Sequence, residues 1–391
     1  MVLRFLDAGE SHGRCLLGII EGFPQGVELN QEKIDYQLQR RQGGFGRGSR
    51  MKIEQDHLEI LAGIIEGKSI GSPIGLLIKN KDWENNDPKN MNELTIPRPG
   101  HADLAGLIKY NLDNYRPILE RASARNTAMR VAIGAIAQQL LEYFSIYSFS
   151  HVISIGNISV KNAILQKIKK ENSVDSLTEL KDKINKSAVF CVDDETSQGM
   201  VQKIKQAAEE GNSLGGQFEI IVRNVPIGLG SHVFWDRRID SRIAGALMSI
   251  PSVKAVEIGE GIKSSKNKGS IAHDAIYFQK NKQNSNYYRK KNWAGGIEGG
   301  ITNGENIVVR VYLKPIPTLL QPLPSVDIKT KKEIRADYQR SDICVVPAAS
   351  AVGEAVVNWE LATVFIEKFG NDSLREIENN FNNYLKRIQE C

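Results

Sequence analysis

The sequence predicts a single globular domain in which helices and strands share one core. The chain has 391 residues, and its 41% hydrophobic content is enough to bury a substantial interior. No internal repeat of about 20–50 residues, low-complexity tract or Pro/Ser-rich linker divides it. The chemically distinctive motifs are spread along its whole length, so we expect one domain over residues 1–391 with a shared ligand pocket.

Charge and cysteine usage narrow the class of protein. A net charge of +5, from 51 Lys+Arg against 46 Asp+Glu, suits small anionic ligands better than nucleic acid. The cysteines have no spacing typical of a zinc site or a disulfide framework: Cys15, Cys191, Cys344 and Cys391. The N-terminal residues turn polar at Glu10, too early for a signal peptide, and no run of about 18 apolar residues exists. We expect a cytoplasmic protein with reduced thiols, no bound metal and no membrane contact.

The central predicted element is a helix that begins near Thr127. From there to Ala137 nearly every side chain is small or apolar, the pattern of a helix buried on most sides. The segment before it, residues 121–125, reads RASAR. Two arginines and a hydroxyl near a helix N-terminus, with its unpaired N–H groups and positive dipole end, suit a phosphate or another anion.

The remaining elements follow from periodicity and capping. Helices are predicted from Asn30 to Arg41, over residues 235–248, from about residue 346 with an apolar core stripe, and from Leu374 to the C-terminus. Strands are predicted over residues 16–20, 63–68, 74–78, 215–223 and 307–313, with 63–68 and 74–78 forming a hairpin or two neighbouring strands.

Two lysine-rich segments are predicted to lie at the periphery. Residues 160–186 are only loosely amphipathic. Residues 263–292 hold eight basic residues and one acid, Asp274, so we expect an exposed basic insertion, for which a solvated loop without a specific role is the alternative.

Two histidines lie beside glycine. His12, in the motif GESHG at residues 9–13, can bring an imidazole against a ligand, although a turn with a surface histidine is the alternative. Nothing resembling GxSxG surrounds Ser11, which argues against an esterase-type nucleophile. His101, in RPGHAD at residues 98–103, is a candidate acid, base or donor, and a turn histidine bonded to Asp103 is equally supported.

Three further segments suit anionic or flat ligands. Residues 40–50 combine four glycines with four arginines, which predicts forked donors on a mobile backbone; an RNA-binding segment and a solvated basic loop are the alternatives. Residues 295–304 are so rich in glycine that they allow close backbone approach to a flat ligand, or simply form tight turns. Residues 314–318, KPIPT, hold a lysine and a threonine on a stiff backbone.

Taken together, seven motifs resemble those of the chorismate synthase family in order and spacing: GESHG (9–13), RRQGGFGRG (40–48), RPGHAD (98–103), RASAR (121–125), GGITNG (299–304), KPIPT (314–318) and RSD (340–342). The resemblance implies an α+β fold, a single-domain β-α-β sandwich with helices packed between antiparallel sheets, and a homotetramer. It also implies a carbon–oxygen lyase of the shikimate pathway. Such an enzyme catalyses the 1,4-anti elimination of phosphate from 5-enolpyruvylshikimate 3-phosphate to give chorismate, using reduced FMN without net redox change.

The resemblance also implies roles for individual residues. His12, with Ser11 beside it, would donate to the leaving phosphate, His101 would lie by the reduced isoalloxazine, and Asp342 would assist deprotonation at flavin N5; Ser123 belongs to the same catalytic set. The implied flavin-binding residues are Arg121, Ala122, Ser123, Ser252, Gly299, Lys314, Pro315, Ile316, Pro317, Thr318 and Arg340. The implied substrate-binding residues are Arg41, Arg47 and Arg50.

The sequence departs from the family pattern at three places. Asn126 replaces a common glutamate, which removes any ion pair that the carboxylate makes; Pro251 and Ser252 replace an amide-plus-alanine pair; and Asp7 replaces a common threonine. No dinucleotide-binding unit or added reductase domain is recognisable, so an external flavin reductase is expected in place of reduction by NADPH. A non-catalytic anion- or RNA-binding protein and a different flavin-dependent lyase are the alternative functions.

Overall fold

Two antiparallel sheets, one of four strands and one of five, form two layers of the domain. The computed structural model describes residues 3–48, 55–81, 83, 93–170, 174–280, 285–336 and 342–390. One sheet has the order β1 (Arg4–Ala8), β2 (Cys15–Glu21), β6 (Ile74–Lys79), β3 (Glu59–Ala62). The other has the order β10 (Val253–Ile258), β15 (Ile307–Leu313), β9 (Gly216–Arg223), β7 (Tyr147–Ile155), β8 (Ile158–Ser159). All neighbouring strands in both sheets are antiparallel.

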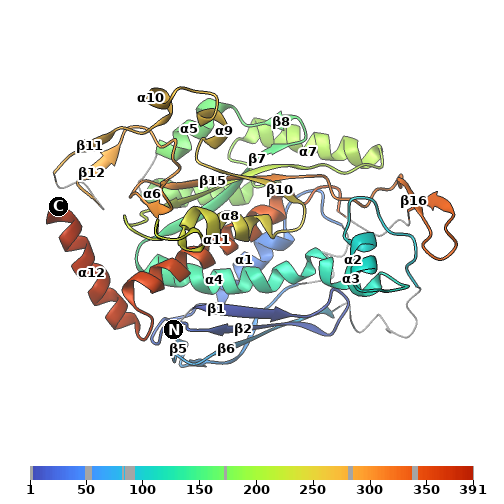
Figure 1. The fold of residues 1–391 in the computed structure, drawn as a ribbon, viewed down its shortest axis with the longest axis horizontal. Coiled ribbons are helices and arrows are strands. Elements are labelled where there is room, and N and C mark those ends of the chain that lie inside the picture. The colour runs from blue at the N-terminus through green and yellow to red at the C-terminus, as the bar shows by residue number, and fades with distance from the viewer. Residues whose placement is uncertain are drawn as a thin grey trace.

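Two long apolar helices lie between the sheets (Figure 1). They are α4 (Thr127–Tyr143) and α11 (Val346–Phe369), flanked by α1 (Gln31–Gln42) and α8 (Ile239–Met248). Gly134 allows α4 and α11 to approach closely, because a Cβ there would lie 2.3 Å from the carbonyl oxygen of Ala355. By length and composition α11 could cross a membrane, but 94% of its apolar window is buried, as in a core helix. This β-α-β arrangement confirms the predicted α+β fold.

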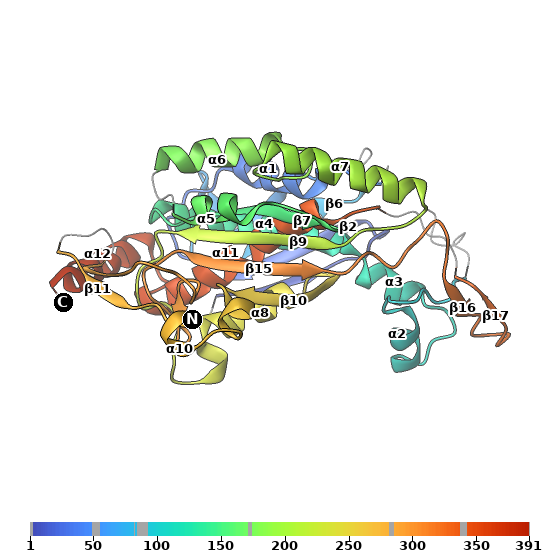
Figure 2. The same cartoon turned by 90° about the horizontal axis from the view of Figure 1, so that it is seen from above.

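The smaller elements cluster at the two ends of the sandwich (Figure 2). At one end lie α2 (Asp103–Lys109), α3 (Arg116–Ala122), β16 (Pro324–Val326) and β17 (Glu333–Arg335). At the other end lie α12 (Leu374–Glu390) and the hairpin β11 (Ile276–Phe278) and β12 (Tyr287–Arg289). The hairpin follows α9 (Gly261–Ser264) and α10 (Gly269–Ala272), and most described residues from 263 to 280 are exposed.

Several predicted elements take a different form. Residues 63–68 do not pair with 74–78: β4 (Ile64–Ile65) and β5 (Lys68–Ser69) form their own small hairpin, while β6 pairs with β2 and β3. The lysine-rich segment forms α5 (Asn162–Lys170) and α6 (Val174–Lys186), each with a clear apolar face that packs into the core. Further along the chain, α7 (Asp194–Glu209) packs against β7 and β8.

The RASAR segment does not belong to one continuous helix. It spans the end of α3 and a 3-10 turn, η4 (Ala124–Asn126), before α4 begins at Thr127. A second 3-10 turn, η5 (Trp235–Arg237), likewise precedes α8. Ser123 stands at the break between α3 and η4, where its side chain accepts a hydrogen bond from the Arg125 N–H. The break matters because it turns successive residues of this segment toward different neighbours.

Candidate functional site

A cavity of about 640 Å³ lies where α3, η4 and α4 meet the loops before α2 and α11. Its size falls within the range of roughly 300–1,000 Å³ that is typical of sites for small molecules and cofactors. The cations that line it are Arg41, Arg47, Arg98, Arg125 and Lys314. The other ionisable side chains on its wall are His12, His101 and Asp342. The cavity therefore presents an excess of positive charge to a ligand.

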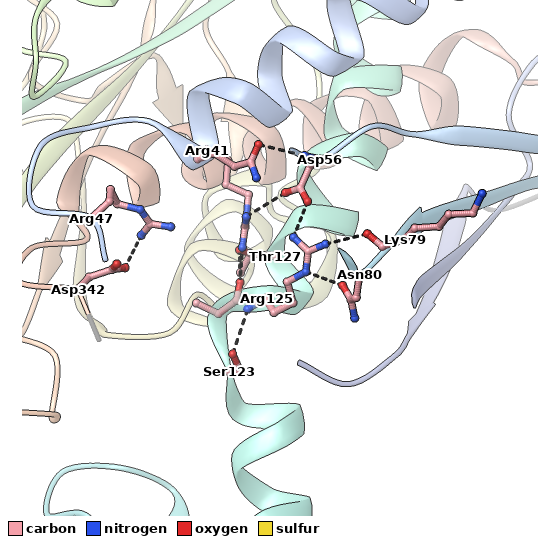
Figure 3. Close-up of polar contacts among 11 residues, drawn as sticks. Arg41, Arg47, Asp56, Lys79, Asn80, Ser123, Arg125, Thr127 and Asp342 are labelled. Carbon is pink, nitrogen blue, oxygen red and sulfur yellow. Dashed lines mark hydrogen bonds and ion pairs between the residues drawn. The ribbon is translucent and has the colours of Figure 1, made fainter. Parts of the chain in front are cut away.

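Two of the arginines share one buried carboxylate (Figure 3). Asp56 accepts from Arg41 Nη1 at 3.3 Å and from Arg125 Nη1 at 2.5 Å. Burial lowers the pKa of Arg41 to about 10, a change that the charge of Asp56 opposes, so the guanidinium stays protonated at neutral pH. With two guanidinium groups against one carboxylate, a net positive charge remains for a ligand.

Arg41 and Arg125 are also held in place by neutral groups. Arg41 Nε donates to Thr127 Oγ1 at 2.9 Å, and Arg125 Nε donates to Asn80 Oδ1 at 2.7 Å. Arg41 lies in the last turn of α1, which confirms the helix predicted up to this residue, so the mobile backbone predicted for residues 40–50 does not apply to Arg40 and Arg41. Since Arg40 and Arg41 are only 8% and 3% exposed, neither is available to an RNA backbone at the surface.

Arg47 and Asp342 join two loops at the cavity wall (Figure 3). Arg47 Nη1 lies 2.6 Å from Asp342 Oδ2, and the Gly48 N–H donates to Asp342 Oδ1 at 2.6 Å. The contact connects the arginine-glycine segment with the residues just before α11, which are 295 positions apart in the chain. Charge-assisted contacts of this kind are short and directional, so they hold the Asp342 carboxylate at the cavity.

His12 is paired with Glu120 from the last turn of α3. His12 Nδ1 lies 2.9 Å from Glu120 Oε1, and the His12 backbone N–H donates to Oε2 at 2.8 Å. Beside this pair, Ser123 Oγ donates to Ser11 Oγ at 3.1 Å. The structure thus brings Ser11, His12 and Ser123 together, and it adds Glu120, which sequence reasoning missed.

His101 is paired with Asp103, two residues further along the chain. The fully buried Asp103 carboxylate also accepts from Arg98 Nε at 2.8 Å and from the Arg98 backbone N–H at 3.1 Å. Burial by itself would raise the pKa of Asp103, but the hydrogen bonds from His101 and Arg98 lower it to about 2. Arg98 Nη1 then reaches Thr318 Oγ1 at 3.2 Å, which ties this pair to the KPIPT segment.

The predicted flavin-binding residues do not all reach the cavity. Those that line it are Ala122, Ser123, Ser252, Lys314, Ile316, Pro317 and Thr318. Arg121 instead points to Asp7, with Nη2 2.7 Å from Oδ1, because it ends α3 on the exposed side. Gly299 and Pro315 do not line the cavity, and Gly299 forms the tight turn between β13 (Ile297–Glu298) and β14 (Ile301–Thr302). Arg50 and Arg340 lie outside the described residues.

One part of the cavity wall is apolar and made of small side chains. It includes Ala122, Ala124, Ala348 and Ala349, with Val352 and Ile250 beside them. Small side chains leave room for a flat aromatic ring, while Lys314 and the arginines suit an anionic tail, so the residues present fit a flavin mononucleotide. Within the described part of the chain, no group of His, Cys, Asp and Glu side chains could hold a metal ion.

The fold and this cavity give a domain with one pocket that is rich in cations and flanked by two histidine–carboxylate pairs, as in many enzymes. Comparisons with known proteins identify the family of this chain. The family model described as chorismate synthase matches residues 3–366. The chain is 50% identical to the chorismate synthase of Alkaliphilus metalliredigens over 393 residues, which covers 98% of this chain and 99% of the relative.

Other relatives and a solved structure give the same result. The chorismate synthase of Desulforamulus reducens is 49% identical over 398 residues, with all of both chains covered at 100%. A crystal structure of chorismate synthase superposes with a TM-score of 0.81 at 40% identity and covers 100% of this chain and 99% of that one. The chain belongs to the chorismate synthase family, whose members are carbon–oxygen lyases.

Proposed function

We propose that this protein eliminates phosphate from 5-enolpyruvylshikimate 3-phosphate to give chorismate, with reduced FMN bound in the same cavity and no net redox change. The observation that carries the proposal is one cavity lined by five cations, by two histidines that each pair with a carboxylate outside the lining, and by an alanine-rich wall. The substrate has a phosphate and two carboxylates, so it requires several positive groups in one place. Membership of the family supports the same reaction.

Arg41, Arg47 and Arg125 are proposed to bind the anionic groups of the substrate. Arg41 and Arg125 are fixed through Asp56, so the orientation of each guanidinium is set before the ligand arrives. Preorganised guanidinium groups bind carboxylate and phosphate with little further loss of side-chain entropy. Arg50 remains a predicted member of this set.

His12 is proposed to donate to the phosphate as it leaves. The C–O bond to phosphate breaks, a ring hydrogen is lost, and negative charge develops on the departing oxygen. A proton held on His12, next to the Ser11 hydroxyl, stabilises that charge at the cavity wall. The apolar residues around the cavity limit the access of water to the reacting bond.

Ala122, Ser123, Ser252, Lys314 and Thr318 are proposed to hold the flavin. When bound, the reduced flavin supplies electron density to the ring as the phosphate departs. His101 is proposed to lie beside the isoalloxazine, held by Asp103. The Asp342 carboxylate, fixed by Arg47, is proposed to be the base that would assist deprotonation at N5 of a bound flavin. Arg340 remains a predicted flavin contact, whereas Arg121, Gly299 and Pro315 do not line the cavity.

We further propose that the protein assembles as a homotetramer. The outward face of the sheet of β1, β2, β6 and β3 is apolar, with Leu6, Leu17 and Ile19 exposed by 76%, 44% and 52%. A contiguous apolar sheet face marks an interaction site. Leu6→Lys combined with Ile19→Lys should reduce the assembly in sedimentation velocity; an unchanged sedimentation coefficient would exclude this face as a subunit contact.

An anaerobic assay with dithionite-reduced FMN and 5-enolpyruvylshikimate 3-phosphate tests the reaction. Chorismate should form at a rate that depends on both compounds. A repeat in air with oxidised FMN and NADPH should give no product, because we propose that an external reductase supplies the reduced flavin. No chorismate in the first assay would remove the proposed function, and activity in the second would show that the protein reduces its own flavin.

A further inference from the structure

We propose that Glu120 is a positioning residue for His12: it keeps a proton on Nδ1, directs Nε2 toward the reacting group, and stabilises the imidazolium that donates to the leaving phosphate. The inference rests on the role proposed above for His12. It concerns a residue that lies one position before the RASAR motif and belongs to none of the catalytic, flavin-binding or substrate-binding sets described above. Glu120 does not line the cavity, so it acts through the histidine.

The geometry fixes both the backbone and the ring of His12. Glu120 Oε2 accepts from the His12 backbone N–H at 2.8 Å, and its two oxygens lie 2.9 and 3.1 Å from Nδ1. The main chain adds a third contact, since the Ser11 N–H donates to the Glu120 carbonyl oxygen at 3.1 Å. One residue of α3 thereby holds the Ser11 and His12 pair at the cavity.

The protonation state of Glu120 decides which ring nitrogen carries the proton. Burial would raise its pKa, but the hydrogen bonds from the His12 ring and backbone lower it, so the group is an ionised carboxylate at neutral pH. An ionised carboxylate only accepts hydrogen bonds. Nδ1 must therefore be the donor, which makes Nε2 the acceptor nitrogen of the neutral ring.

The charges around His12 explain why a carboxylate is needed. Arg116, on the same helix, has Nη1 at 3.7 Å from Glu120 Oε1. The cavity wall shared with His12 carries Arg41, Arg47, Arg98, Arg125, Lys314, His101 and Asp342. Positive neighbours disfavour a second cation, whereas an adjacent carboxylate favours it. Glu120 is thus the negative group placed directly against the ring that must hold a proton in a cationic cavity.

Kinetic variants test the proposal. In Glu120→Gln the charge is lost while one acceptor remains, so kcat near pH 7.5 should fall about tenfold, with KM for the phosphorylated substrate changed less than about threefold. The alkaline limb of the kcat profile should move to lower pH, because a cation next to a carboxylate loses that stabilising charge. In Glu120→Ala kcat should fall about a hundredfold, and in Glu120→Asp kcat should lie between that of Glu120→Ala and that of the parent protein.

A matched control separates this effect from a general loss of an ion pair. Glu142 pairs with Lys33 at 2.7 Å and has 19% side-chain exposure, close to the 12% of Glu120, but it does not line the cavity. Glu142→Gln should leave the pH profile unchanged and kcat within about twofold of that of the parent protein, as expected for a partly exposed pair. A uniform loss at every pH in Glu120→Gln, or no loss at all, would overturn the positioning role.

A second measurement does not depend on activity. In protein labelled with ¹⁵N-histidine and assigned with His12→Ala, neutral His12 should show the Nδ1–H tautomer, and Glu120→Ala should shift it toward Nε2–H. An Nε2–H tautomer in the parent protein would overturn the inference. If the parent shows the Nδ1–H tautomer but makes no chorismate, the proposed function fails while the positioning by Glu120 stands.

Discussion

The two histidine–carboxylate pairs differ in how the chain brings them together. His101 and Asp103 are two residues apart and meet within one turn at the start of α2. His12 and Glu120 are 108 residues apart and meet only because the loop after β1 packs against the end of α3. The first pair is a local feature of the backbone, and the second is a product of tertiary packing.

The pairs also differ in burial and in the neighbours that share the carboxylate. The Asp103 side chain is 0% exposed and also pairs with Arg98. The Glu120 side chain is 12% exposed, and its second partner, Arg116, lies farther away, at 3.7 Å. Asp103 therefore stabilises a loop as well as a histidine. The Glu120 carboxylate contacts mainly His12, which suits a group that positions a proton donor.

The largest expected effect is on turnover when either histidine is removed. His12→Ala and His101→Ala should each lower kcat by about two or more orders of magnitude, as the loss of general acid–base groups does. His12→Ala should leave the affinity for reduced FMN within about threefold, because this histidine is assigned to the leaving phosphate. Stopped-flow chorismate formation and flavin titration measure the two quantities. Near-normal rates in both variants, with flavin bound, would remove both roles.

The next effect is on stability and should distinguish the carboxylates. Asp103→Asn leaves Arg98 with a weaker partner inside the protein, so we expect a loss of about 3 kcal/mol in the free energy of unfolding. Glu120→Gln should cost about 1 kcal/mol, because its pair is partly exposed. Urea unfolding followed by fluorescence compares them, with the exposed Asp236→Asn as control. Equal losses would contradict the difference in burial.

The effect confined to the narrowest conditions is a pH dependence of stability at the Asp103 pair, which develops only at acidic pH. Its pKa is lowered to about 2 in the folded protein, against roughly 3.9 in an unfolded chain. The stabilisation, about 3 kcal/mol, is therefore complete above about pH 5 and disappears as the pH falls from 4 toward 2. The difference in urea midpoint between the parent and Asp103→Asn should shrink over that interval. A constant difference down to pH 3 would show that the carboxylate does not titrate as described.

Local chemistry was sufficient for much of the fold. Apolar periodicity predicted the central helix from Thr127, and the observed β15 has the predicted bounds, Ile307–Leu313. The strand pairing that was predicted wrongly has a simple cause. The pairing of β6 with β2 and β3, in place of residues 63–68, depends on contacts between distant segments, which no window of sequence contains.

The site divides in the same way. The predicted His12, His101 and Asp342 all line one cavity, and the alternative of a turn histidine bonded to Asp103 also holds in the structure, because the two side chains meet within one turn. What short-range pattern could not predict was Glu120 as the partner of His12, or Arg125 in place of Arg121 on the cavity wall.

By itself the sequence determined many of the helices and strands and a set of candidate site residues, because residue type, spacing and helical or strand periodicity are local properties. The tertiary structure alone decided how the residues are paired. In the folded chain the RASAR segment is divided between α3 and η4. Arg121 therefore contacts Asp7, whereas Arg125 contacts Asp56. Electrostatic partners are chosen by distance in space, and this distance is set by how the sheets and helices pack.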